Sequence, residues 1–141
     1  MISRRTILKI SALTWAGTPV GWVQVSNAAT DSVLNRSVEL GGVTVEIPRL
    51  VDNGNSIPIS FEITPPKGIG IKNIEVIAPE NPQPVLIKLN LNSFTTPYRF
   101  GTRIRLAASQ NVWVLAYLTD GKIIAGNAST VLTASACFDG T

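Results

Sequence analysis

The stretch VWVLAYLTDGKIIAG, residues 112–126, decides the fold class of the chain. Residues 112–118 form a continuous apolar run rich in β-branched and aromatic side chains, which is typical of a β-strand covered on both faces. Asp120-Gly121 then predicts a two-residue hairpin turn, because these residue types tolerate the backbone angles that such a turn requires. We therefore expect residues 122–125 to return antiparallel to residues 112–118, and residues 127–136 to form a last strand.

The chain from residue 43 onward also alternates between strand and turn patterns. VTVEI (43–47) and IPISFEI (57–63) place apolar residues at every second position, as half-buried strands do. Asn53-Gly54 marks a tight turn between them, and Pro58 suggests that the second strand begins at a sheet edge. Three further strand patterns are IKNIEVIA (71–78), VLIKLNL (85–91) and RFGTRIRLAA (99–108). Helical periodicity is nowhere sustained beyond two turns, so the sequence predicts an all-β, immunoglobulin-like (Ig-like) sandwich of about eight strands.

The N-terminus has the pattern of an export signal. Arg4 and Arg5 stand within SRRTILK (3–9), which fits the twin-arginine pattern, and a short apolar run follows. Small residues at positions 26–28 offer a cleavage site after Ala28. An ordinary secretory signal with two adjacent arginines is the alternative. We expect a signal peptide at residues 1–28, the sandwich domain at 29–134 and a flexible C-terminal arm at 135–141, in a protein exported to the periplasm by the twin-arginine pathway.

Composition narrows the classes of function. Of the 12 Lys and Arg residues, three lie in the expected signal, which leaves nine against 9 Asp and Glu in the exported chain. A neutral chain is not expected to bind nucleic acid. The N-terminal apolar run is too short to span a membrane, so we expect no membrane attachment after cleavage. The chain has no histidine, which removes the usual catalytic triads, zinc sites and His-ligated haem. We therefore expect no metal, no cofactor and no catalytic activity of its own.

Cys137 is the only cysteine of the chain, so it cannot form an internal disulfide. One interpretation places it on an exposed segment, where its thiolate can attack sulfur, a metal or a disulfide. The other places it in the core at the end of the last strand, since free cysteine is among the most buried residue types. Val131, Thr133, Ser135 and Cys137 share one face of that strand by alternation, and the polar character of the face favours exposure.

Arg99, Arg103 and Arg105 also share a parity, so they line one strand face unless Gly101 breaks the strand. Guanidinium groups placed in a row can attract a small oxyanion or an acidic partner surface. The alternative is an ordinary solvated face that carries surface charges.

Three stretches together resemble the SoxY family, the sulfur-carrier proteins of bacterial thiosulfate oxidation. They are VEIPRLVDNGNSIPISFEI (45–63), ENPQP (80–84) and TRIRLAASQNVWVLAYLTDGKIIAG (102–126). The twin-arginine pattern and the cysteine at position 137 complete the resemblance, which covers about residues 43–137. It implies a non-catalytic carrier with an Ig-like fold, which works as a heterodimer with SoxZ, a small β-sandwich subunit.

The same resemblance implies that Cys137 is the covalent anchor of the pathway intermediates. A haem-containing enzyme couples thiosulfate to it as an S-thiosulfonate, and a manganese-dependent hydrolase then releases sulfate and leaves a persulfide; both enzymes are transient partners. The arm of the family is usually Gly-Gly-Cys-Gly-Gly. Here Phe138 adds bulk beside the sulfur, and Asp139 disfavours the thiolate. The competing class of function is an exported Ig-like interaction module whose cysteine is buried or forms an intermolecular disulfide.

Overall fold

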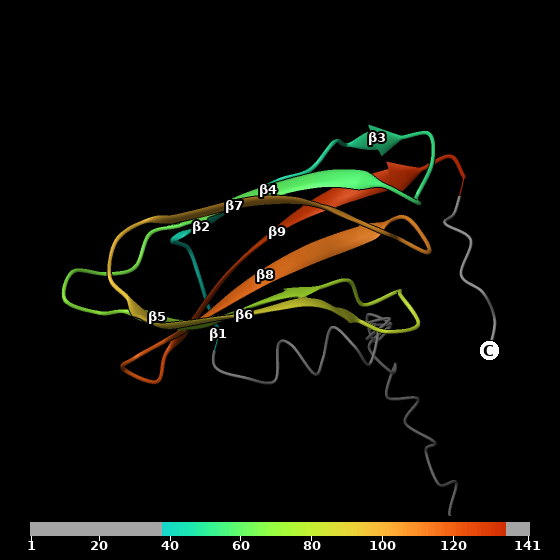
Figure 1. Ribbon diagram of the computed structural model, residues 1–141. Coiled ribbons are helices and arrows are strands. Elements are labelled where there is room, and N and C mark those ends of the chain that lie inside the picture. Colours follow the sequence, from blue (N-terminus) through green and yellow to red (C-terminus); the bar gives the residue numbers. More distant parts are fainter. Residues whose placement is uncertain (1–37, 135–141) are drawn as a thin grey trace, which may run out of the picture.

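Residues 38–134 are the part of the chain that the computed structural model describes (Figure 1). They form the strands β1 (Val38–Leu40), β2 (Val43–Glu46), β3 (Leu50–Val51), β4 (Ile57–Ile63), β5 (Ile71–Ile77), β6 (Val85–Phe94), β7 (Tyr98–Ile104), β8 (Gln110–Leu118) and β9 (Ile123–Leu132). Turns and loops join the strands, and this part of the chain holds no candidate for a membrane-spanning helix. The all-β fold class predicted from the sequence is confirmed.

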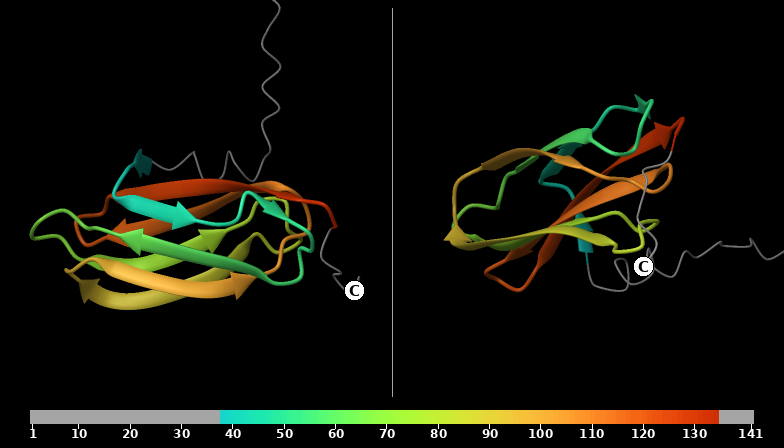
Figure 2. Two further views of the ribbon diagram at one scale, coloured as in Figure 1. Left: turned by 90° about the horizontal axis from the view of Figure 1, so that it is seen from above. Right: turned by 45° about the vertical axis from the view of Figure 1, so that its right-hand side comes forward.

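The strands form two sheets that lie as two layers (Figure 1, Figure 2). The larger sheet has six strands in the order β1-β9-β8-β5-β6, and β3 pairs with β9 as well. The smaller sheet has the order β2-β4-β7. β1 and β3 pair parallel with opposite ends of β9, whereas the other neighbouring strands are antiparallel. Two packed, mainly antiparallel sheets of this kind form the Ig-like sandwich that the sequence predicts.

The core lies between the two sheets because the alternating strands turn their apolar faces toward each other. On β4, every second residue from Ile57 to Ile63 is at most 2% exposed. β8 contributes Val114 and Ala116 to the same cluster, and β5 contributes Ile74. Full burial of one such aliphatic side chain stabilises the folded state by about 1.5–3 kcal/mol. The period-two pattern of the sequence therefore accounts for the interior of the sandwich.

The central strand β8 is buried on both faces, as its uninterrupted apolar sequence predicts. Trp113 and Leu115 point away from the core between the sheets and are 8% and 0% exposed. They form a second cluster with Ile77 and Ala125 from the neighbouring strands. The larger sheet thus has apolar side chains on both of its faces near its middle.

The last hairpin differs from the sequence prediction in its second half. The two strands expected at residues 122–125 and 127–136 are one continuous strand, β9, which ends at Leu132. Gly126, between the two expected segments, lies within this strand. A Cβ atom at this position would come 2.4 Å from the carbonyl oxygen of Val43, so glycine lets β2 approach β9 closely.

The start of β4 agrees with the edge position that Pro58 suggests. β4 pairs with β7 along its whole length, from Ile57 to Ile63, but with β2 only from Ser60 onward. One side of β4 is therefore open at Pro58, where a proline can be accommodated without breaking a ladder. β1 and β3 were not predicted, because strands of three and two residues carry no readable periodicity.

Candidate functional site

The candidate site is the end of the sandwich at which β9 leads toward Cys137. Cys137, Phe138 and Asp139 lie outside the described residues, as do Arg4 and Arg5 of the expected export signal. The described chain ends at Ala134, three residues before the thiol. The structure therefore shows the surface next to the predicted sulfur-binding segment.

Backbone hydrogen bonds hold the chain on the sandwich up to Ala134. β3 runs parallel to the end of β9 (Figure 1) and pairs with it at Val131 and Leu132. Beyond the strand, the amide of Thr133 donates to the carbonyl oxygen of Val51 at 3.0 Å. The carbonyl oxygen of Ala134 accepts from the amide of Gly54, also at 3.0 Å. The Asn53-Gly54 turn, predicted only as a connection, thus also fastens the end of the described chain.

Two side chains add to this attachment. The hydroxyl of Thr133 donates to the carbonyl oxygen of Asp52 at 3.0 Å, and Ser109 Oγ accepts from the amide of Leu132 at 2.8 Å. Thr133 and Ser109 are exposed, so each bond contributes modestly to stability while fixing the direction of the chain. We call residues 131–134, with these partners, the anchor.

Asn81 holds together the loops beside the anchor, and the sequence reasoning missed this role. Asn81 is only 5% exposed, and its Nδ2 donates to the carbonyl oxygen of Arg105 at 2.8 Å. Its Oδ1 accepts from the amide of Ala107 at 2.9 Å and from Gln110 Nε2 at 3.1 Å. The motif ENPQP was visible in the sequence, but its partners lie more than 20 positions away along the chain.

The three arginines of the predicted row do not act alike. Arg99 and Arg103 lie on the exposed face of β7, and Gly101 does not break the strand, as the alternation requires. Arg105 is exposed too, but it lies just beyond the end of β7. The common face is therefore confirmed for the two arginines within the strand.

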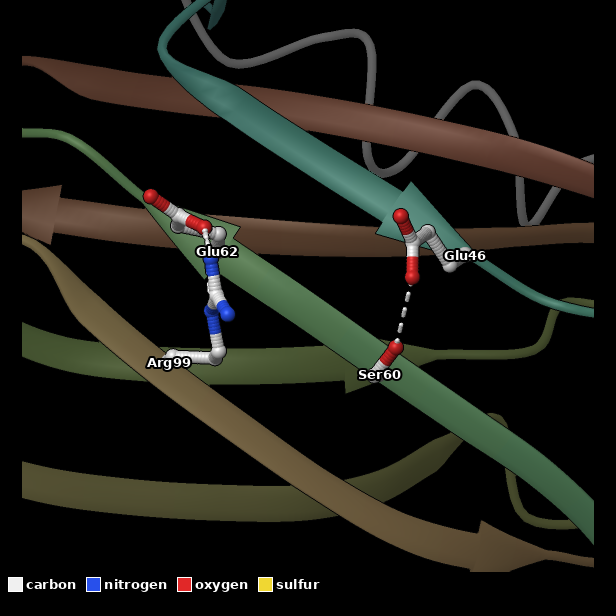
Figure 3. Close-up of polar contacts among 4 residues, drawn as sticks. All are labelled: Glu46, Ser60, Glu62 and Arg99. Carbon is white, nitrogen blue, oxygen red and sulfur yellow. Dashed lines mark hydrogen bonds and ion pairs between the residues drawn. The ribbon is translucent and has the colours of Figure 1, made fainter.

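Arg99 is engaged by a carboxylate on the neighbouring strand. Its Nε donates to Glu62 Oε2 at 3.0 Å, and its Nη2 makes a second, shorter contact with the same oxygen (Figure 3). This hydrogen bond, with the charge of Glu62, raises the pKa of Arg99 above its usual value. Ser60 donates to Glu46 Oε2 at 3.2 Å on the same face. Arg99 is thus already paired and is the weakest anion ligand of the row.

Arg103 and Arg105 have looser surroundings. Arg103 Nη1 makes only long bonds to Ser56, 3.4 Å to the carbonyl oxygen and 3.3 Å to Oγ. The guanidinium of Arg105 has no hydrogen bond or ion pair with the residues that the structure describes. Both side chains line a groove of about 260 Å³ between the start of β6 and the end of β7. These two cations are the ones available to an anion or an acidic segment.

A larger groove, of about 1160 Å³, lies on the other side of the sandwich, where β2 leaves β4. Its lining includes Val45, Pro58, Ser129 and Val131. Its lining residues include no thiol and no cluster of acid or base groups. Despite its size, we therefore do not take it as the functional site. Across residues 38–134, no group of three or more His, Cys, Asp or Glu side chains is placed to hold a metal ion.

Comparison with known proteins shows which family and which solved structures the chain resembles. The family model described as sulfur oxidation protein SoxY matches residues 30–137. A search of the curated proteins finds no match. Among solved structures, the sulfur carrier protein SoxY from Chlorobium limicola f thiosulfatophilum has a TM-score of 0.61 at 18% identity, over 74% of this chain and 94% of that chain.

Superoxide reductases have a similar fold. A putative superoxide reductase from Thermotoga maritima has a TM-score of 0.56 at 12% identity, over 70% of this chain and 96% of that chain. A neelaredoxin-type superoxide reductase from Ignicoccus hospitalis gives 0.52 at 11% identity, over 67% and 94%. At such identities these similarities establish the sandwich fold and nothing about chemistry.

Proposed function

The chain belongs to the SoxY family, and from that membership we propose that it is a sulfur carrier that holds intermediates of reduced-sulfur oxidation on Cys137. The observation that carries the proposal is the span of the family match, which reaches residue 137 and so includes the thiol. No acid, base or nucleophile of the described residues is assigned a catalytic role. The protein is then a bound substrate for other enzymes rather than an enzyme itself.

The geometry of the anchor supports this role. β9 ends at Leu132, so the strand does not continue as far as the sequence pattern suggested. Val131 is 53% exposed and Thr133 is exposed, so the end of the described chain, which leads to Cys137, faces solvent. Three residues span at most about 11 Å, so the thiol is within that distance of the fixed end of the described chain. A partner enzyme can approach a group in that position.

The proposed chemistry balances in two steps. The thiol of Cys137 and thiosulfate form the S–S bond of an S-thiosulfonate, and one proton and two electrons leave to an oxidising haem partner. Water then attacks the sulfonate sulfur in a manganese-dependent partner, which breaks the bond to the inner sulfur, releases sulfate and a proton, and leaves the cysteine persulfide. This chain supplies the sulfur atom that forms and keeps the new bond.

The proposal includes location and partners. Twin-arginine export through Arg4 and Arg5 would bring the chain folded to the periplasm, together with a SoxZ-like small sandwich subunit that lacks its own signal. Replacing both arginines by lysine should then leave the precursor in the cytoplasm. Export of the double variant would instead indicate the ordinary secretory route.

The test of the carrier function is the intact mass of protein purified from its own host during growth on reduced sulfur. We expect mass increments of one sulfur atom or one thiosulfate group, which reductant removes and which map to the peptide that contains Cys137. Cys137→Ser should lack them. Protein without any such adduct, or a chain found only as a disulfide-linked dimer, would favour the alternative of an exported interaction module.

A further inference from the structure

The groove between β6 and β7 has two kinds of surface. Arg103 and Arg105 provide two exposed guanidinium groups. Val85, Leu86 and Ile87, at the start of β6, provide an apolar wall, of which Val85 is 41% exposed. An aromatic side chain next to a carboxylate would match both surfaces, since the ring can pack on the apolar wall while the carboxylate pairs with a guanidinium.

The groove lies at the same end of the sandwich as the anchor. The carbonyl oxygen of Ala134 accepts from Gly54, and the carbonyl oxygen of Gly54 accepts from the amide of Leu106 at 2.9 Å. Leu106 follows Arg105 directly in the chain. Gly54 alone therefore connects Ala134, the end of the described chain, to the segment that carries the two arginines. The path through Gly54 is roughly 10 Å long if each hydrogen bond and each residue adds about 3 Å.

The chain beyond Ala134 carries the matching pair of side chains. Phe138 and Asp139 follow Cys137 directly, at the positions where the family arm usually has glycines. Asp139 is five residues from Ala134, and five residues reach up to about 18 Å. This length is sufficient to place Asp139 at Arg105, which lines the same groove as the start of β6.

We propose that the Phe138-Asp139 pair docks in the groove between β6 and β7, with the Asp139 carboxylate on Arg103 and Arg105, and thereby holds Cys137 against the sandwich. The two side chains that depart from the glycine arm then have a common purpose. Charge complementarity selects this occupant, because the pair carries one carboxylate and the groove carries two loosely held cations. The proposal rests on the proposed carrier function only for its purpose, which is to hold the thiol at one place on the surface of the sandwich.

The test measures the docking without any sulfur chemistry. In the 15N-labelled exported protein at low salt, we expect backbone order parameters of about 0.8 at Phe138 and Asp139, close to those of the strands. Asp139→Asn and Arg105→Glu should each lower them below about 0.6, the range of flexible backbone. The double variant Asp139→Arg with Arg105→Glu exchanges the charges and should restore the order.

Lys72→Glu is the matched control, because it reverses one exposed charge near the opposite end of the sandwich and should change nothing at residues 138 and 139. Order parameters below about 0.6 in the unmodified protein would overturn the proposal. An ordered segment that is insensitive to Arg105→Glu would overturn it too, as would a flexible segment combined with weaker binding of an acidic partner in that variant. The sulfur adduct on Cys137, measured separately by mass, distinguishes failure of docking from failure of the carrier function.

Discussion

The interior of the sandwich and the anchor of the C-terminal segment are held by different interactions. In the interior, Phe61, Val114 and their neighbours are at most 2% exposed and contact one another across the two sheets. At the anchor, hydrogen bonds hold the chain: exposed Thr133 donates to Val51 and Asp52, and the amide of half-buried Leu132 donates to Ser109. The interior buries apolar area, whereas the anchor orients a short piece of chain.

This difference separates global stability from local order. Apolar burial contributes about 25 cal/mol per Å², so large interior side chains carry the stability of the fold. A typical exposed hydrogen bond contributes only about 0.5–1.5 kcal/mol. Changes at the anchor should therefore leave the protein folded and alter only how firmly residues 131–134 are held.

Removing an interior ring should have the largest effect. Phe61→Ala should lower the free energy of unfolding by about 3–5 kcal/mol, because the ring leaves a cavity between the sheets and loses its contact with Phe100. Urea unfolding can be followed through Trp113, the only tryptophan outside the expected signal. Phe94→Ala is the control, since Phe94 is 40% exposed and should cost roughly 1 kcal/mol. Equal losses in the two variants would contradict the comparison.

The polar junction beside the anchor should rank second. Asn81→Ala removes the acceptor of the Ala107 amide and the donor to Arg105, and a buried group left unsatisfied costs about 1–3 kcal/mol. Asn111→Ala, on an exposed position of β8, should stay within about 0.5 kcal/mol of the unmodified protein. Both values come from the same urea titration. If Asn81→Ala lost no more stability than Asn111→Ala, the hydrogen bonds of Asn81 would not be needed to hold the loops together.

The sequence predicted the interior well because its pattern is local. The alternation of IPISFEI places four apolar residues on one face of β4, and the unbroken run from Val112 to Leu118 predicts a strand buried on both faces. Burial of one face determines the spacing of apolar residues within a few positions, so no other part of the chain is needed to read it.

The anchor and the pairing of the arginines could not be predicted in the same way. β3 is two residues long and is defined by its pairing with β9, about 80 positions later. Arg99 is neutralised by Glu62, 37 positions earlier, because the register of β4 and β7 places them side by side. Such contacts depend on which strands become neighbours, and a single sequence does not encode that in any local pattern.

A small change at the anchor should sharpen the comparison. Thr133→Val keeps the shape of the side chain and removes the hydrogen bond to Asp52, so global stability should fall by about 0.5 kcal/mol. Local opening should increase more clearly. We expect the Gly54 amide, which donates to Ala134, to exchange roughly fivefold faster, as a loss of about 1 kcal/mol in local stability implies.

The control for this exchange experiment lies in the hairpin at the other end of the sheet. The Leu118 amide donates to the carbonyl oxygen of Lys122 and should exchange at an unchanged rate in Thr133→Val. Faster exchange at both amides would mean that the substitution loosens the whole fold. In that case the anchor would not be separable from the interior.

The smallest effect on stability is expected at the thiol itself. Cys137→Ser should change the free energy of unfolding by less than about 0.5 kcal/mol, because the proposed carrier function requires an exposed thiol and an exposed side chain contributes little packing. The same variant should lose every sulfur adduct, so the largest functional effect coincides with the smallest structural one. Iodoacetamide should label Cys137 readily in the folded protein, as an exposed thiol requires. Labelling slowed by orders of magnitude, together with a clear loss of stability in Cys137→Ser, would place the thiol in the interior and contradict the carrier function.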